Sequence, residues 1–242
     1  KEFATPVVSL LRNFSAPVKL EMPRSLDELA FLLSYDTDAF NRWEAGQTLA
    51  INIILGLVDD IGQQRPLKVN TTIIDAFKQV LNTQWNDLSY FSLLLNLPSE
   101  TYLAEQMQVV DIDAIHEARE LVIRTLAETL QKEFKTLYLA HHRDESGVFD
   151  SDAIGRRRVK NACLAYLSKL QDSEVQLWAS EQFKTAGNMT DQMAALTSIV
   201  HNNHSTKADS LAAFYRQWQN EALVVDKWFI LQATSPATDT FE

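Results

Sequence analysis

The sequence is poor in the residues that most often interrupt or cross-link a chain. Its 242 residues include 6 glycines, 6 prolines and one cysteine, Cys163. So few glycines and prolines argue against a collagen-like, linker-rich or turn-dense all-β protein. A single cysteine excludes an internal disulfide framework. This fits a reducing compartment, so we expect a cytoplasmic protein, and a periplasmic location stays open.

Positive charge is scarce as well. The chain has 22 lysines and arginines against 32 acidic residues, which gives a formal net charge of −10 at pH 7. Binders of nucleic acids or of anionic membranes usually have the opposite balance, because both surfaces are negatively charged. The most apolar run, residues 49–58, is interrupted by Asn52. It is half as long as the ~20 residues of a membrane-spanning helix. We therefore expect neither a nucleic acid nor a membrane among the partners.

The motifs of the common catalytic classes are missing. A zinc hydrolase of the HExxH type needs two histidines four residues apart on a helix. The nearest match is residues 116–120, where Glu120 stands in place of the second histidine, so we interpret His116 and Glu117 as helix surface. There is no GxGxxG, GxxxxGK or GxSxG pattern either. The sequence therefore offers no catalytic constellation.

The remaining candidates fit ordinary helix chemistry. His201 and His204 lie three residues apart at an expected helix end. The two histidines at 141–142 also lie at an expected helix end, and the helix dipole favours histidine at such ends. Cys163 lies in an apolar helical stretch, where a free cysteine is usually a small core residue. The three arginines at 156–158 fan around a helix, so we expect a solvated turn rather than a phosphate site. We assign no catalytic, cofactor-binding or metal-ligating residue to this chain.

What the sequence does contain, from residue 25 onward, is a series of helix signals. Polar capping residues precede apolar residues at helical spacing. The expected helix starts include a capping box at Ser25, caps at Asp38, Asn70 and Asp111, and a second capping box at Ser173. The helix after Asp111 is expected to be the longest and to end at about His142. About ten or eleven helices with short joints predict an all-α bundle or α-solenoid of antiparallel helix pairs. No repeat of fixed period is present, so the solenoid would be irregular.

Residues 1–20 have a different character. They are short, β-leaning segments broken by Pro6 and Pro17. They are too few to form a sheet alone. We expect a short extended N-terminal arm, or strands whose partners lie outside this chain.

Several motifs resemble one known family in order and spacing. They are Phe14-Ser15-Ala16-Pro17-Val18, Leu97-Pro98-Ser99-Glu100, Asn161-Ala162-Cys163-Leu164, Asn188-Met189-Thr190-Asp191 and residues 226–233, Asp-Lys-Trp-Phe-Ile-Leu-Gln-Ala. The likeness is to the bacterial aminopeptidase N family of zinc-dependent gluzincin peptidases, and it spans about residues 6–236. It implies that residues 1–20 are the end of a small β-domain. Residues 21–242 would be the first portion of the C-terminal helical domain, an irregular superhelix truncated at its C-terminal end.

The resemblance also implies what this chain lacks. The family's HExxH zinc motif is absent, and none of the four methionines is followed by the Glu-Asn of its amine-binding segment. Zinc and catalysis would belong to the catalytic domain of the same polypeptide, and this chain alone should be inactive. Its partners would be that catalytic domain, the β-domain and peptide substrates.

Two functions are open at this point. The first is a substrate-gating, structural domain of a zinc metallo-aminopeptidase that removes N-terminal residues from peptides. The second is a free-standing α-solenoid module that binds a protein partner. An HExxH motif upstream in the same reading frame would decide for the first. On the first hypothesis, the apolar residues at 7–14 and 224–231 should lack their cover. These ends should then be disordered, folded back on the helices or buried against another copy of the chain.

Overall fold

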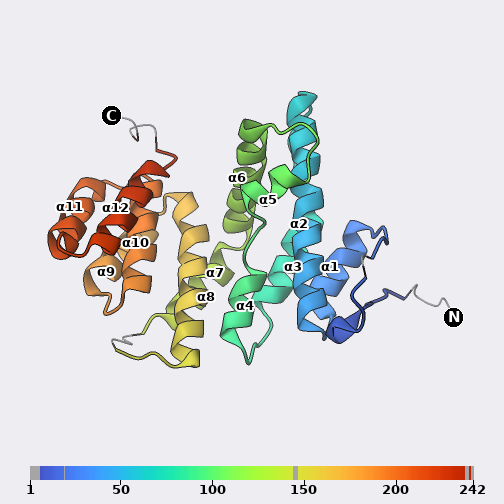
Figure 1. The fold of residues 1–242 in the computed structure, drawn as a ribbon, viewed down its shortest axis with the longest axis horizontal. Helices are drawn as coiled ribbons and strands as arrows, with labels where there is room; N and C mark the ends of the chain where they lie inside the picture. Colours follow the sequence, from blue (N-terminus) through green and yellow to red (C-terminus); the bar gives the residue numbers. More distant parts are fainter. Residues whose placement is uncertain (1–5, 19, 144–146, 238–239, 241–242) are drawn as a thin grey trace. The chain divides into compact units, whose positions relative to one another are not determined.

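The structure is all-helical. The computed structural model describes residues 6–18, 20–143, 147–237 and 240. Within these ranges it contains twelve α-helices, two short 3-10 helices and no β-strand (Figure 1). The prediction of an all-α fold is thereby confirmed. The α-helices are α1 (Leu26–Tyr35), α2 (Ala39–Gly62), α3 (Thr71–Leu81), α4 (Leu88–Leu94), α5 (Glu100–Glu105), α6 (Ile112–Thr129), α7 (Gln131–His141), α8 (Ser151–Leu167), α9 (Ser173–Thr185), α10 (Met189–His201), α11 (Lys207–Trp218) and α12 (Ala222–Ala233), and the 3-10 helices are η1 (Arg12–Phe14) and η2 (Ser168–Leu170).

Most helices begin where the sequence predicts. Ser25 and Glu28 form the expected capping box at α1, since each side chain accepts a hydrogen bond from the other residue's backbone N–H. The Asp38 carboxylate accepts from the N–H of Asn41 at the start of α2, and Asn70 caps α3 in the same way. These bonds satisfy backbone donors that have no partner inside the helix.

Two expectations about helix limits are wrong. The single long helix expected from Asp111 to about His142 is instead two helices, α6 and α7, divided at Leu130. Leu130 has φ −110° and ψ 23° and is buried, so the backbone leaves helical geometry there while the apolar side chain stays in the core. The longest helix is therefore α2, with 24 residues.

The second correction concerns the start of α9. The cap is Asp172, whose carboxylate accepts from the N–H of Glu174, and Ser173 is the first residue of the helix. The capping box predicted at Ser173 is therefore wrong. Asp172 has the short acidic side chain that suits this position, and its second carboxylate oxygen accepts from Lys135 Nζ at 2.7 Å.

The chain divides into two compact units. The first comprises residues 1–86 and 93–133, in which α2 packs against α1 and α6, and α3 against α1. Its core is aliphatic and includes Leu49, Ile54, Ile73, Val122 and Leu126, all of them fully buried.

The second unit comprises residues 87–92 and 134–242. Its centre is α10, which packs against α8, α9, α11 and α12. Sequential helices are neighbours here, as expected for short connections. Gly155 of α8 allows a close approach, since a Cβ atom there would lie 2.8 Å from the Cβ of Leu88.

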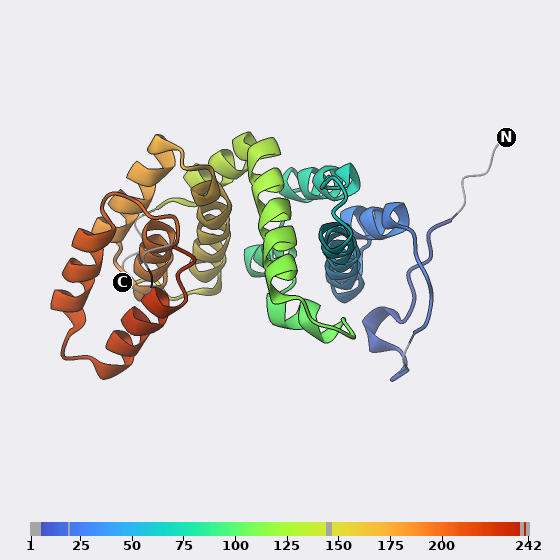
Figure 2. The same cartoon turned by 90° about the horizontal axis from the view of Figure 1, so that it is seen from above.

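The N-terminal arm joins no sheet among the described residues. Figure 2 shows it running past α1 as an extended segment that is interrupted by η1. Leu11, Asn13 and Phe14 have positive φ values between 54° and 56°, so the chain turns sharply there. The expected extended arm is present among the described residues, with a turn that the sequence did not predict.

Candidate functional site

The structure places the predicted surface histidine as expected. His116 lies on α6, and its Nδ1 is 2.8 Å from Glu100 Oε1. Within the described ranges, no three histidine, cysteine or acidic side chains gather closely enough to hold a metal ion. A catalytic zinc normally takes three protein ligands. The described residues therefore do not fit a catalytic zinc.

His201 and His204 have separate environments. His201 Nε2 donates to the carbonyl of Leu231 at 3.1 Å and so ties the end of α10 to α12. His204 is 4% exposed, and neither ring nitrogen has a partner in the part of the chain that the structure describes. Burial lowers the pKa of both imidazoles. Both are thus held as neutral groups inside the helical packing.

Cys163 and the three arginines at 156–158 all lie in α8. Cys163 is fully buried in α8, and burial raises the pKa of its thiol far above the usual range, which makes it a poor nucleophile. Arg157 is buried too, and it donates to the carbonyl of Val148 at 3.0 Å. The expectation of a solvated turn is therefore wrong for Arg157, while Arg158 is exposed.

A polar cluster that sequence reasoning missed lies between α8, α9 and α10. Asp191 Oδ2 accepts from Lys160 Nζ at 2.8 Å, and Oδ1 accepts from Asn161 Nδ2 at 2.8 Å. Gln182 Nε2 donates to Asn161 Oδ1 at 2.9 Å, and Gln182 Oε1 accepts from the Tyr138 hydroxyl at 3.1 Å. Two of the family-like motifs, residues 161–164 and 188–191, thus meet in space. Their spacing in the sequence gave no signal of this contact.

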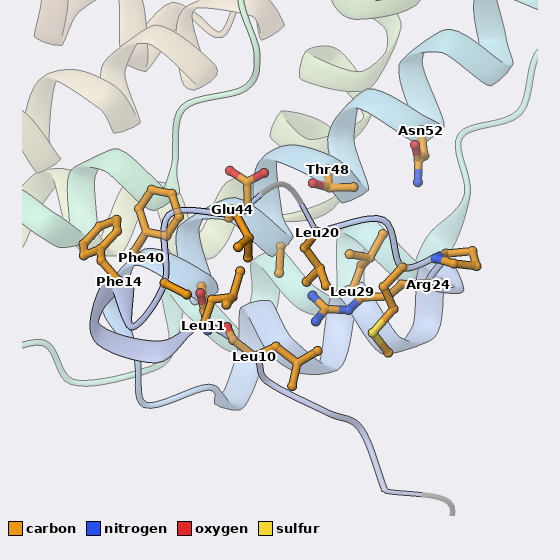
Figure 3. A pocket seen from close by; sticks show the side chains of 16 residues that line it. Leu10, Leu11, Phe14, Leu20, Arg24, Leu29, Phe40, Glu44, Thr48 and Asn52 are labelled. Carbon is orange, nitrogen blue, oxygen red and sulfur yellow. Dashed lines mark hydrogen bonds between the residues drawn. The ribbon is translucent and has the colours of Figure 1, made fainter.

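A hollow lies under the N-terminal arm. It has a volume of about 720 Å³ and is lined by the arm together with α1 and α2 (Figure 3). Its walls are mainly apolar, with Phe14 and Phe40 in contact at 4.8 Å between ring centroids. Glu44 and Arg24 add one charge of each sign. The hollow is a groove rather than a closed site, because much of its lining is exposed, including Phe14 at 74%.

Polar contacts hold this arm in place. Arg12 pairs with Asp36 at 2.7 Å, and the N–H of Asn13 donates to Asp38 Oδ2 at 2.9 Å. Asn41 Nδ2 donates to the carbonyl of Leu10 at 2.7 Å. The arm is thereby attached through polar groups, while its apolar side chains keep little cover.

Helix α12 presents a second uncovered apolar surface. Leu223 is 79% exposed and Ile230 is 61% exposed, and Phe229 is also exposed. Val224, Val225 and Trp228 are half-buried, and Leu231 alone in this stretch is buried. Phe14, Phe229 and Ile230 thus lack cover among the described residues, whereas the other apolar residues of the two ranges are covered in part and Leu231 is covered fully.

Taken together, these features define an all-helical domain with exposed apolar side chains on the arm and on α12. The chain belongs to the family described as "Domain of unknown function (DUF3458_C) ARM repeats", whose pattern matches residues 26–242. ARM repeats are α-solenoids built from stacked helices. None of the described helices is both long and apolar enough to cross a bilayer.

The curated relatives place the chain within a larger protein group. It is 38% identical over 237 residues to Aminopeptidase N of Escherichia coli, and 36% identical over 243 residues to Aminopeptidase N of Caulobacter vibrioides. The Haemophilus influenzae Aminopeptidase N is 34% identical over 242 residues. These alignments cover 98–99% of this chain and 27% of each relative.

A solved structure agrees with these relatives. The chain superimposes on the crystal structure of Legionella pneumophila aminopeptidase A in complex with aspartic acid with a TM-score of 0.79 and 27% sequence identity. The match covers 95% of this chain and 28% of that one. The chain therefore spans little more than a quarter of the length of the proteins that it resembles, and the resemblance to the aminopeptidase N group is confirmed.

Proposed function

We propose that this chain is the first portion of the C-terminal helical domain of a zinc-dependent aminopeptidase, and that it limits access to the catalytic domain. The observation that carries the proposal is the 38% identity to an Aminopeptidase N across 98% of this chain and 27% of that relative. The length and the similarity of this segment support the same fold and the same place in the polypeptide as in its relatives.

On this proposal, residues 1–20 end a small β-domain and residues 21–242 begin the helical domain. The uncovered apolar side chains of the arm and of α12 support these limits. Burying one large apolar side chain contributes about 1.5–3 kcal/mol, so surfaces of this kind favour contact with a partner. The partners are the β-domain, the catalytic domain and the later helices of the same polypeptide.

The chemistry lies outside this chain. Zinc supplies the Lewis acid and the activated water of such a peptidase when it is bound, and the described residues offer no ligand set for it. The helical domain contributes enclosure: its bulk excludes folded proteins and bulk water, and admits peptides. Peptides with a free N-terminus are the proposed substrates of the whole polypeptide.

The first test is the reading frame that encodes the chain. We expect an HExxH motif upstream in the same frame, and we expect the complete polypeptide to release the N-terminal residue of a tripeptide. The same residue at the N-terminus of a folded protein should be released far more slowly. A reading frame without a zinc motif would overturn the proposal and favour a free-standing α-solenoid module. Equal rates on the peptide and the folded protein would remove the gating role.

A further inference from the structure

A small cavity lies where the polar cluster meets the ends of three helices. Its volume is about 180 Å³. It is lined by His142 and Arg143 after α7, Lys160 of α8, Gln182 and the last residue of α9, and Asn188 and Asp191 at the start of α10. The volume suits a molecule of a few non-hydrogen atoms, since a water molecule takes about 30 Å³.

The one carboxylate in this lining is already engaged. Asp191 accepts from Lys160, from Asn161 and, at 3.1 Å, from Asn188 Nδ2. Its backbone N–H donates to Asn188 Oδ1 at 2.9 Å. Asp191 therefore has little capacity left for a further cation.

Lys160, in contrast to Asp191, has hydrogen-bonding capacity left. The residue is 3% exposed, and its ammonium carries three N–H donors. Within the described part of the chain, Asp191 Oδ2 is the one acceptor that this ammonium meets. A buried charged group with unsatisfied donors is costly, so the remaining donors favour an acceptor inside the cavity.

Arg143 adds a positive charge to the cavity, and His142 lies beside it. Arg143 is exposed, lines the cavity, and forms no ion pair with a described residue. Burial lowers the pKa of His142, and the charge of Lys160 lowers it further, against the opposing effects of Glu181 and Asp191. Lys160 offsets the charge of Asp191, so Arg143 leaves the lining with a net positive charge in a chain whose net charge is −10.

We propose that this cavity binds a small carboxylate, with Lys160 Nζ as the buried donor and Arg143 as the second cation at its opening. A carboxylate presents two oxygens with about four acceptor positions, enough for the two remaining donors of Lys160 and two donors of Arg143. A free acid and the acidic end of a peptide offer the same group, so the test includes both. The site is independent of the proposed gating role.

The experiment measures the pKa of the His142 imidazole by NMR in the 242-residue chain. Acetate and acetyl-alanyl-alanine are titrated separately, with chloride replaced so that the ionic strength stays constant. A carboxylate beside Lys160 offsets the ammonium charge, so the pKa of His142 should rise and saturate with ligand. Saturation by acetate alone assigns a free acid, and saturation by the peptide assigns a peptide end. The His142→Gln variant identifies the resonance.

Substitutions of the cationic side chains test whether the ligand binds in this cavity. The Arg143→Gln variant removes an exposed charge and should weaken binding about fivefold, the size of a solvent-exposed charge contact. The Arg158→Gln variant removes the same charge from the surface of α8 outside the cavity and should change affinity by less than about twofold. Lys160→Met should abolish binding where the variant folds. The proposal is overturned if the pKa of His142 is the same in acetate, peptide and chloride, or if both arginine variants weaken binding equally.

Discussion

At the residue scale, buried polar groups are the most informative positions. The chain holds an ion pair, Lys160 with Asp191, in which both side chains are almost fully buried. Removing one partner of such a pair leaves an uncompensated charge, which costs far more than losing an exposed pair. His204 is different, because it is buried with no hydrogen-bond partner among the described residues.

The buried imidazole of His204 makes stability depend on pH. Burial lowers its folded-state pKa below the ordinary value of 6.5, so the unfolded chain binds the proton more readily. The contribution of the neutral imidazole is fully present above about pH 6.5 and is lost as the pH falls below that value. His204→Leu should flatten the fall in urea midpoint between pH 8 and pH 5. His201 also has a lowered pKa, so part of the fall should remain. An unchanged pH profile in the variant would contradict this assignment.

Gly155 tests the close approach of α8 to residues 88 and 89. An added Cβ would lie 2.8 Å from Leu88 Cβ and 3.1 Å from the backbone nitrogen of Ser89. Gly155→Ala should therefore destabilise the chain by about 1–3 kcal/mol, the usual cost of overpacking. Gly56 of α2 is the control, since a Cβ there meets nothing within 4 Å. Gly56→Ala should stabilise by about 0.5–1 kcal/mol, measured by urea unfolding. Equal effects of the two substitutions would show that α8 does not come this close to residues 88 and 89.

At the element scale, the sequence predicts most of the helices because their signals are local. Ser25, Asp38 and Asn70 each offer a side-chain oxygen to a nearby backbone N–H, and no distant residue is needed. The division at Leu130 has no such signal, because neither glycine nor proline marks it and the apolar spacing continues across it. The polar cluster around Asp191 could not be predicted from the sequence either, since residues some 30 positions apart meet only through tertiary packing.

The start of α9 separates the sequence expectation from the structure. Asp172→Ala removes the cap and the ion pair with Lys135, and should cost about 1 kcal/mol or somewhat more. Ser173→Ala changes an exposed residue inside the first turn and should alter stability by less than about 0.5 kcal/mol. Urea denaturation of both variants provides the measurement. A larger loss for the Ser173 variant would restore the capping box that the sequence suggested.

At the scale of the whole molecule, the chain is an ARM-repeat domain with two uncovered apolar surfaces, on the arm and on α12. Its described residues provide no set of three metal ligands. Both features agree with the proposed function, because contact surfaces and catalytic groups can belong to different domains of one polypeptide.

The isolated chain should bind no stoichiometric zinc and hydrolyse no aminoacyl amide. The physical reason is the missing ligand set among the described residues, since catalytic zinc normally takes three protein ligands. The measurement is elemental analysis after dialysis against zinc, together with an aminoacyl amide assay. One tightly held ion per chain would contradict this prediction and would direct attention to His201 and His204.

Hydrogen exchange in the arm tests the central claim most directly. In the 242-residue chain, few backbone N–H groups of residues 6–18 meet an acceptor among the described residues, and those of Asn13 and Val18 are two that do. Most amides of the arm should therefore exchange rapidly. In the complete polypeptide, neighbouring strands should slow them by about tenfold or more, while the amides of α8 stay unchanged as a control. Equal exchange of residues 6–18 in both proteins would contradict the account and leave the chain as a self-contained module.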